Sequence, residues 1–340
     1  MHSKDEKRFA VIGAGYYASL QIPAWLEVKG AKLMALCNRT ISKAEDLAKK
    51  YDIPGVYDDA EKMLINEKLD FVDIITHTST HAGYVYLAAK YKLPVICQKP
   101  MALDYETCKS MVQACMDHGV PFMIHENFRW QLPKRGVKQI LDEGIIGKPY
   151  RAHLQLSTGG AEAFVNEPGL KTLENYALAD MGTHLFDLAR FFFGEPQNVY
   201  CQTYRSLKDI KGDNVVCSML GFDNLICTCE ISDAISYGVF IEGEKGWLEL
   251  RTDDSIHINT VEGTTIRNFP SPHHSWASDY VVKRHGPDRI HGIVECNNSL
   301  FKSIRTGQPA ETSAEETLKT MRIIFAALES SKSNKVIGLK

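Results

Sequence analysis

Three side chains of this sequence have the chemistry needed to move a proton beside a charged oxygen: Lys99, Asp180 and His184. Asp180 and His184 are four residues apart in a stretch that predicts one helix over 180–193, so they are expected to share a face. Asp180 would lie near the start of that helix, where the dipole favours an ionised carboxylate. The spacing leaves two interpretations open. The pair could hold and transfer a proton, or Asp180 could cap the helix while His184 is a core histidine bonded to the backbone.

Lys99 stands where an apolar run, Val95–Cys97, ends in Gln98-Lys99-Pro100. A lysine–proline pair is an ordinary way to end a strand. In a parallel sheet, however, the carboxyl ends of all strands lie on one edge, and ligands bind there. Polar residues follow the apolar runs at 38–39, 76–81, 98–100 and 125–127. These segments are expected to converge on one crevice, with Lys99 facing it.

The elements that would build this edge are visible in the first 125 residues, where short apolar runs alternate with helix-like segments. The predicted strands are Phe9–Ile12, Lys32–Cys37, Phe71–Ile75, Pro94–Cys97 and Pro121–Ile124, and the clearest helices cover 42–51, 82–91 and 104–118. Strands separated by helices of this length are typical of βαβ units. We therefore predict a doubly wound α/β Rossmann domain over residues 1–125.

The pattern changes in the second part of the chain, 126–340. Consecutive strands are predicted at 151–158, 214–222, 225–232, 238–244, 246–252 and 255–261, and two further helices at 289–305 and 313–330. Several of the connections are short, which favours a large, mainly antiparallel sheet with one open face. We predict an α+β domain for substrate binding and oligomerisation, with the open face of the sheet joining a homodimer or homotetramer.

The first predicted strand is followed by a glycine-rich loop, Gly13-Ala14-Gly15-Tyr16-Tyr17-Ala18, which opens a helix. In this position a G-x-G-x-x-A pattern predicts dinucleotide binding. Gly13 permits the turn, Gly15 lets the backbone approach a pyrophosphate, and Ala18 lets the helix pack closely on its strand. Tyr17 is counted with the loop, and Tyr16 could cover the nicotinamide or substrate, or simply pack.

The end of the second strand is expected to select the dinucleotide. It carries Asn38 and Arg39 but no acid that could accept from a ribose 2′-hydroxyl. Arg39 could meet a 2′-phosphate, so NADP is slightly favoured and NAD stays open. The other predicted cofactor contacts come from the remaining strand ends and are Thr76, Thr78, His81, Gln98, Lys99 and Asn127. His77 and His81 have metal-like spacing, but no third ligand is evident, so no metal is predicted.

Composition excludes several classes of partner. The chain has 340 residues, a net charge of −3, 44% hydrophobic and 24% charged residues, which gives no reason to expect nucleic acid or a membrane as partner. The N-terminus passes from charged residues into a strand without a signal-peptide pattern, so a cytoplasmic protein is expected. The nine cysteines are scattered and are expected to be reduced.

These motifs together resemble the Gfo/Idh/MocA family of oxidoreductases over nearly the whole chain. The resemblance rests on the loop at 13–18, the T-x-x-x-x-H stretch ending at His81, Q-K-P at 98–100, and D-M-G-T-H at 180–184 with Asp187. The family's usual E-K-P is Q-K-P here, so the amide at position 98 can hydrogen-bond but carries no charge. C-Q-K-P with H-E-N-F-R-W-Q at 125–131 is similar to a branch that includes D-apiose dehydrogenase-like enzymes.

The resemblance implies that Lys99, Asp180 and His184 are catalytic and surround a sugar alcohol or sugar carbonyl. Asn127 and Arg129 could also reach sugar hydroxyls, although a salt bridge is an equal alternative for Arg129. The expected activity is hydride transfer between NAD(P) and a sugar or polyol. Two alternatives use the same scaffold: a non-catalytic sensor of dinucleotide and sugar, and a redox enzyme for glycosides that keeps its cofactor bound.

Overall fold

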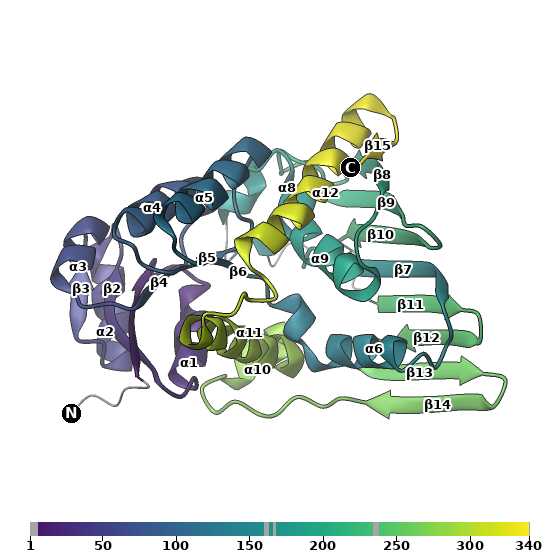
Figure 1. The fold of residues 1–340 in the computed structure, drawn as a ribbon, viewed down its shortest axis with the longest axis horizontal. Helices are drawn as coiled ribbons and strands as arrows, with labels where there is room; N and C mark the ends of the chain where they lie inside the picture. The colour runs from purple at the N-terminus through teal and green to yellow at the C-terminus, as the bar shows by residue number, and fades with distance from the viewer. Residues whose placement is uncertain (1–5, 160–162, 166–167, 234–237, 340) are drawn as a thin grey trace. The chain divides into compact units, whose positions relative to one another are not determined.

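The computed structural model describes residues 6–159, 163–165, 168–233 and 238–339 (Figure 1). The chain forms two compact units. The first contains 1–127 and 274–319, and the second contains 128–273 and 320–340. The first change of unit lies two residues after the predicted boundary at residue 125. Residues 274–319, which were predicted as part of the second domain, group with the first unit, and the domain boundaries stay a prediction.

The first unit is built on a parallel sheet of six strands in the order β3-β2-β1-β4-β5-β6. The strands are β1 (Lys7–Ile12), β2 (Ala31–Cys37), β3 (Gly55–Tyr57), β4 (Phe71–Ile74), β5 (Val95–Gln98) and β6 (Phe122–His125). Residues of β4, β5 and β6 are buried throughout, as expected for strands covered on both faces. The Rossmann prediction is confirmed; only the short, half-buried β3 was missed.

Five helices connect these strands: α1 (Ala18–Leu26), α2 (Ile41–Tyr51), α3 (Ala60–Asn66), α4 (Thr78–Lys90) and α5 (Tyr105–His118). Local chemistry explains several ends. The Asp104 side chain accepts a hydrogen bond from the Thr107 backbone and caps α5, which stops at Gly119 in the left-handed conformation. Asp59 caps α3 in the same way. These caps fix the residues at which α3 and α5 begin.

Two later helices, α10 (Asp279–His285) and α11 (Pro287–Thr306), complete the first unit. Ile293 and Val294 of α11 form a buried cluster with Leu20 and Ala24 of α1. A helix was predicted at 289–305, within α11. The sequence could not say which element its apolar face would cover, and for this reason residues 274–319 were assigned to the second domain.

The second unit contains a sheet of nine strands in the order β14-β13-β12-β11-β7-β10-β9-β8-β15. The strands are β7 (Pro149–Ser157), β8 (Asn198–Tyr204), β9 (Val215–Gly221), β10 (Ile226–Ser232), β11 (Gly238–Gly243), β12 (Gly246–Leu250), β13 (Ser255–Thr260), β14 (Gly263–Asn268) and β15 (Ile337–Gly338). All neighbours are antiparallel except β7 and β10, which are parallel. The mainly antiparallel sheet is confirmed, while β8, β14 and β15 were not predicted.

One face of this sheet is covered by helices. The second unit carries α6 (Leu132–Asp142), α8 (Tyr176–Asp180), α9 (Gly182–Phe193) and, from residue 320 on, α12 (Ala314–Ser333), with short 3-10 turns at Phe128–Trp130 and Pro168–Thr172. Ala152, Leu154 and Leu156 of β7 are buried and alternate with partly exposed residues, and α9 contacts both β7 and β10. In the parts of the chain that the structure describes, no helix has the length and apolarity to cross a membrane.

Candidate active site

The glycine-rich loop of the first unit has the geometry of a phosphate cradle. Gly13 has φ +121°, and a Cβ there would lie 2.1 Å from the carbonyl oxygen of Ile75. Around Gly15, in contrast, nothing lies within 4 Å of the position of a Cβ. The loop therefore needs glycine at its turn and leaves open space at the residue where a pyrophosphate would approach. Ala18 is fully buried at the start of α1, which has no side-chain cap that would compete for an anion.

The two tyrosines of the loop are anchored inside the same unit. The Tyr16 hydroxyl lies 2.7 Å from Nε2 of His285, and its ring packs against the cluster shared by α1 and α11. The Tyr17 hydroxyl accepts a hydrogen bond of 2.8 Å from Nδ2 of Asn127, which is only 1% exposed. Burial raises the pKa of both phenols, which are neutral. Tyr16 thus packs in the first unit, which is one of its two predicted alternatives, and Asn127 holds the hydroxyl of Tyr17. The predicted contacts of Tyr16, Tyr17 and Asn127 with a ligand stay predictions.

Asn38 links the end of β2 to the glycine-rich loop. Its Oδ1 accepts from the Ala14 backbone at 3.1 Å, and its Nδ2 donates to the carbonyl of Thr40 at 2.8 Å. One polar end of this side chain therefore holds the loop that would bind the dinucleotide, and the other holds the residue before α2. The neighbouring Arg39 is exposed and forms no ion pair with a described residue.

His81 is fully buried and braces two strand ends. Its Nε2 lies 3.1 Å from the carbonyl oxygen of Thr76, after β4, and its Nδ1 lies 3.0 Å from that of Pro100, after β5. Burial lowers the pKa of this imidazole. Its ring is fully buried and both nitrogens face backbone carbonyls, so His81 holds the turn that carries Lys99. Its predicted contact with the cofactor stays a prediction.

Lys99 follows β5 at the carboxyl edge of the parallel sheet, as predicted, and is half-buried. Gln98 before it is 5% exposed, and its amide donates to Gln21. Thr76 accepts a hydrogen bond from the Thr80 hydroxyl, and Thr78 begins α4 at the same edge. This edge brings together the predicted residues of the first unit, namely 13–18, 38–39, 76–78, 98–99 and 127.

In the second unit, Asp180 and His184 lie on consecutive helices. Asp180 is the last residue of α8, Met181 caps both helices, and α9 begins at Gly182. The prediction of one helix over 180–193 with Asp180 at its start, as a possible cap, is therefore wrong. The helical pattern ran across the break, where glycine is a poor helix former. The carbonyl of Asp180 accepts from the Thr183 hydroxyl at 2.9 Å, so the junction is still fixed.

His184 lies in the first turn of α9 and is 1% exposed. Its ring stacks on Phe128, with 3.7 Å between the ring centroids and 12° between the planes. A stacked aromatic ring restricts the imidazole to one orientation. The histidine is therefore held in place by its own unit, as a proton-transfer group needs to be.

Arg129 forms a buried ion pair with Asp187 of α9. Its Nε and Nη2 donate to the two carboxylate oxygens at 2.8 and 2.6 Å, and the two residues are 8% and 1% exposed. The guanidinium also lies 5.2 Å from the centre of the Phe191 ring. The salt-bridge alternative for Arg129 is thus the one observed, and its predicted sugar contact stays a prediction. Among the described residues, no cluster of three acidic, cysteine or histidine side chains could hold a metal.

A group of buried polar residues in the first unit was not predicted. Asp73, in the middle of β4, is fully buried and accepts hydrogen bonds from Gln21 and Trp25 of α1. His125, at the end of β6, is 1% exposed and its Nε2 lies 2.9 Å from Oδ1 of Asn297. The sequence did carry one signal for this group, which is Asp73 inside the apolar run Phe71–Ile75. An acid in a buried strand needs hydrogen-bond partners, so buried polar residues were to be expected around it.

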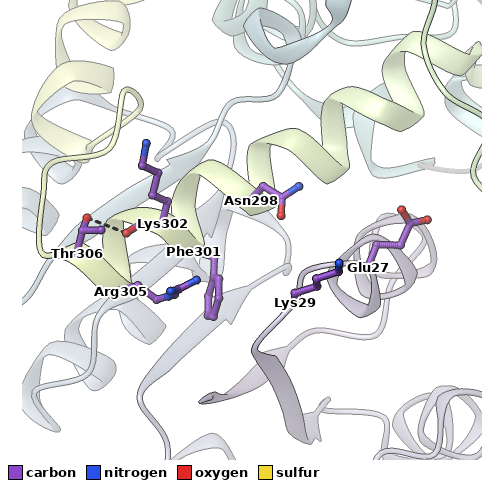
Figure 2. Close-up of a pocket in the computed structure, with 7 residues that line it drawn as sticks. All are labelled: Glu27, Lys29, Asn298, Phe301, Lys302, Arg305 and Thr306. Carbon is purple, nitrogen blue, oxygen red and sulfur yellow. Dashed lines mark hydrogen bonds between the residues drawn. The ribbon is translucent and has the colours of Figure 1, made fainter. Parts of the chain in front are cut away.

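A separate cleft of about 620 Å³ lies elsewhere on the first unit (Figure 2). Glu27 and Lys29, from the connection between α1 and β2, line one side. Residues of α11 line the other: Asn298, Phe301, Lys302, Arg305 and Thr306. This connection enters β2 at its amino end, opposite the carboxyl edge, and no predicted site residue lines the cleft.

Asp73 and His125 are expected to respond to pH in opposite directions. Burial raises the pKa of Asp73 to about 7 and lowers that of His125 to about 4. Unfolding lets His125 bind a proton between about pH 6.5 and 4, so its contribution to the free energy of unfolding falls as the pH falls. Unfolding makes Asp73 release a proton between about pH 7 and 4, so its contribution rises over the same range.

Each contribution should amount to roughly 3–4 kcal/mol across this range, and the two largely cancel in the wild type. Relative to wild type, Asp73→Asn should lose stability as the pH falls from 7 to 4, while His125→Gln should gain it. Urea denaturation at several pH values measures both differences. Parallel pH profiles for the three proteins would contradict this assignment.

Comparison with known proteins agrees with this geometry. Residues 7–126 match the model of the oxidoreductase family with an NAD-binding Rossmann fold (GFO_IDH_MocA), and residues 135–249 match the GFO/IDH/MocA C-terminal domain. The chain is 31% identical over 343 residues to D-apiose dehydrogenase of Rhizobium rhizogenes, with 98% of both chains covered. It is 31% identical over 345 residues to D-apiose dehydrogenase of Paraburkholderia graminis, covering 98% of this chain and 90% of the relative. The crystal structure of an oxidoreductase from Agrobacterium radiobacter with NAD+, L-tartaric acid and magnesium has a TM-score of 0.93, 30% identity and 98% coverage of both chains.

Proposed function

The chain belongs to the Gfo/Idh/MocA family of NAD-binding oxidoreductases, and from that premise we propose that it is an NAD(P)-dependent dehydrogenase of a sugar or polyol. The observation that carries the proposal is the 31% identity, over 98% of the chain, to two D-apiose dehydrogenases. D-Apiose or a related branched aldose is therefore the first substrate to test. The glycine-rich loop supports the cofactor, because Gly13 fits only without a side chain and Gly15 leaves room for a pyrophosphate.

A bound nicotinamide dinucleotide would supply the hydride transfer. Gly13, Gly15 and the start of α1 would hold its pyrophosphate. His184, neutral, would accept the proton of a substrate hydroxyl, and its stacked ring keeps the imidazole in one orientation. Lys99 would stabilise negative charge developing on the substrate oxygen. Asp180 would orient the histidine or a neighbouring hydroxyl.

Steady-state reduction of NAD and NADP by the purified protein tests this proposal. The substrates would be D-apiose, unbranched aldoses and polyols including inositol. Turnover with one carbohydrate is the expected result. Saturable dinucleotide binding without turnover of any of them would overturn the dehydrogenase and leave the sensor as the better description.

Arg39 is proposed to favour NADP by pairing with the 2′-phosphate. It is exposed at the end of β2, and no carboxylate follows that strand at 38–39 to accept from a ribose 2′-hydroxyl. Arg39→Ser should weaken NADP binding by about tenfold and leave NAD binding nearly unchanged. Titration of both dinucleotides by calorimetry measures this, with Lys43→Met, an exposed lysine on α2, as the control. Equal losses for NAD and NADP would contradict it.

The open face of the nine-stranded sheet is proposed to join copies of the chain into a homodimer or homotetramer. Partly or fully exposed apolar side chains lie on its strands, among them Met219, Ile226, Phe240 and Trp247. Burying such residues would stabilise an interface. Light scattering on the purified protein measures the state, and a monomer at micromolar concentration would refute it. The nine free cysteines support a reducing compartment, so the cytoplasm is the proposed location.

A further inference from the structure

A chain of buried polar side chains runs from the middle of β4 to the end of β5. The Oδ2 atom of Asp73 accepts hydrogen bonds from Nε1 of Trp25 and from Nε2 of Gln21, both at 2.6 Å. Oε1 of Gln21 then accepts a hydrogen bond from Nε2 of Gln98. Gln21, Trp25 and Asp73 are fully buried and Gln98 is 5% exposed. This series of hydrogen bonds therefore ends at Gln98, the residue directly before Lys99.

The hydrogen bonds in this chain can point in only one direction while Oδ2 of Asp73 is an acceptor. The indole of Trp25 can only donate, which makes that oxygen an acceptor. Gln21 must then present its amide nitrogen to Asp73 and its oxygen to Gln98. Gln98 must in turn present its nitrogen to Gln21, which leaves its own carbonyl oxygen on the other side of the amide.

The second carboxyl oxygen of Asp73, Oδ1, is buried and makes no hydrogen bond with a described residue. A proton held on Oδ1 would leave Oδ2 an acceptor, so the direction of the chain is the same whether the carboxyl is ionised or neutral. The orientation of both amides thus follows from one buried acid and one indole. Neither glutamine amide can turn alone without placing two acceptors or two donors against each other.

We propose that Asp73 and Gln21 are positioning residues that make Gln98 present its carbonyl oxygen, as a hydrogen-bond acceptor, to a hydrogen-bond donor of the bound dinucleotide. The inference rests on the proposed function, because it assigns the dinucleotide to this edge of the sheet. Gln98 would contribute an acceptor beside Lys99 without adding a negative charge there. The acid of the network lies instead within β4, where Asp73 is fully buried.

Gln98→Glu tests the direction of the hydrogen bonds between positions 73 and 98, with almost no change in the shape of the side chain. An ionised carboxylate at position 98 would place an acceptor against Oε1 of Gln21, while Asp73 prevents Gln21 from turning. Asp73→Asn together with Trp25→Phe removes that restriction. Without the indole, the amide nitrogen introduced at position 73 can take the place of Oδ2 and donate to Gln21, which can then turn and donate to the carboxylate. The triple variant restores the hydrogen bonds between positions 73, 21 and 98 with their direction reversed.

Dinucleotide affinity, measured by calorimetry at pH 8, is the first readout. Gln98→Glu alone should weaken binding by about tenfold or more, since an unmatched buried polar pair is costly. The Trp25→Phe/Asp73→Asn variant alone should change affinity by less than about threefold, because the amide at position 73 can still accept from Gln21 in the native direction. The triple variant with Gln98→Glu should return to within about threefold of that double variant. Wild-type affinity for Gln98→Glu, or no recovery in the triple variant, would overturn the proposal.

Thermal unfolding without dinucleotide separates this proposal from the proposed function. Gln98→Glu should lower the midpoint in the wild-type background but not in the Trp25→Phe/Asp73→Asn background, whether or not the protein binds a dinucleotide. If the wild type binds none, the proposed function fails, and the presentation of Gln98 to a dinucleotide fails with it. If it binds but the variants show rescue only in the midpoint, the network is structural and the positioning role is refuted.

Discussion

Lys99→Met is expected to lower kcat for carbohydrate oxidation by ~10²–10³-fold, the loss typical of removing one group that stabilises a developing charge. Lys99 follows β5 at the carboxyl edge of the parallel sheet, where ligands bind in doubly wound folds. Methionine keeps much of the length of the side chain and removes its charge. The loss should appear mainly in kcat, because the charge on the substrate oxygen develops during the reaction.

Two further measurements make this result specific. Dinucleotide affinity of Lys99→Met should stay within a few-fold of wild type, which shows that the glycine-rich loop is intact. Lys43→Met, an exposed lysine on α2 of the same unit, should leave kcat unchanged. A Lys99→Met enzyme with wild-type kcat would remove this lysine from the mechanism.

The second large effect is on stability. Arg129→Met removes the guanidinium that bonds both oxygens of the buried Asp187 carboxylate. Breaking such a pair from one side should lower the free energy of unfolding by roughly 3–5 kcal/mol, because the remaining carboxylate is still buried. Urea denaturation, monitored by circular dichroism, measures the loss.

Replacing both partners distinguishes this cause from a general packing defect. The double variant Arg129→Met/Asp187→Leu should recover most of the loss, since no charge is then left in the interior. Arg151→Met, in an exposed pair with Glu242 on the sheet of the same unit, should have a much smaller effect. Additive losses in the double variant would show that Arg129 acts through packing alone.

The parts of this protein that follow local rules were predictable from its sequence. Short apolar runs identified the strands that end just before Gly13 and Lys99, because a strand buried on both faces needs continuous apolar residues. The parallel edge then followed from the alternation of strands and helices. Four strands were missed. Of these, β3 and β15 are very short, β14 is mostly exposed, and β8 has only two buried positions, Val199 and Cys201, so none of them carries that signal.

Features that depend on which elements meet were not predictable in the same way. His81 has the position of a ligand contact in the sequence, yet its ring is held between two backbone carbonyls. The Asp180–His184 spacing suggested one helix, but the chain breaks at Met181. Asp73 was visible only as an acid in an apolar strand. Its partners on α1, Gln21 and Trp25, are 52 and 48 residues away in the sequence, so the sequence did not reveal them.

The return of residues 274–319 to the first unit has a consequence for synthesis on the ribosome. Leu20 and Ala24 of α1 are covered by Ile293 and Val294, so their apolar surface has no native cover until residues 293 and 294 have been made. The first unit therefore stays incomplete until most of the second unit has been synthesised. A fragment ending at residue 127 would carry the glycine-rich loop but expose this surface, and it should aggregate. Deletions within residues 274–319 would then damage the N-terminal part of the first unit as much as the region they remove.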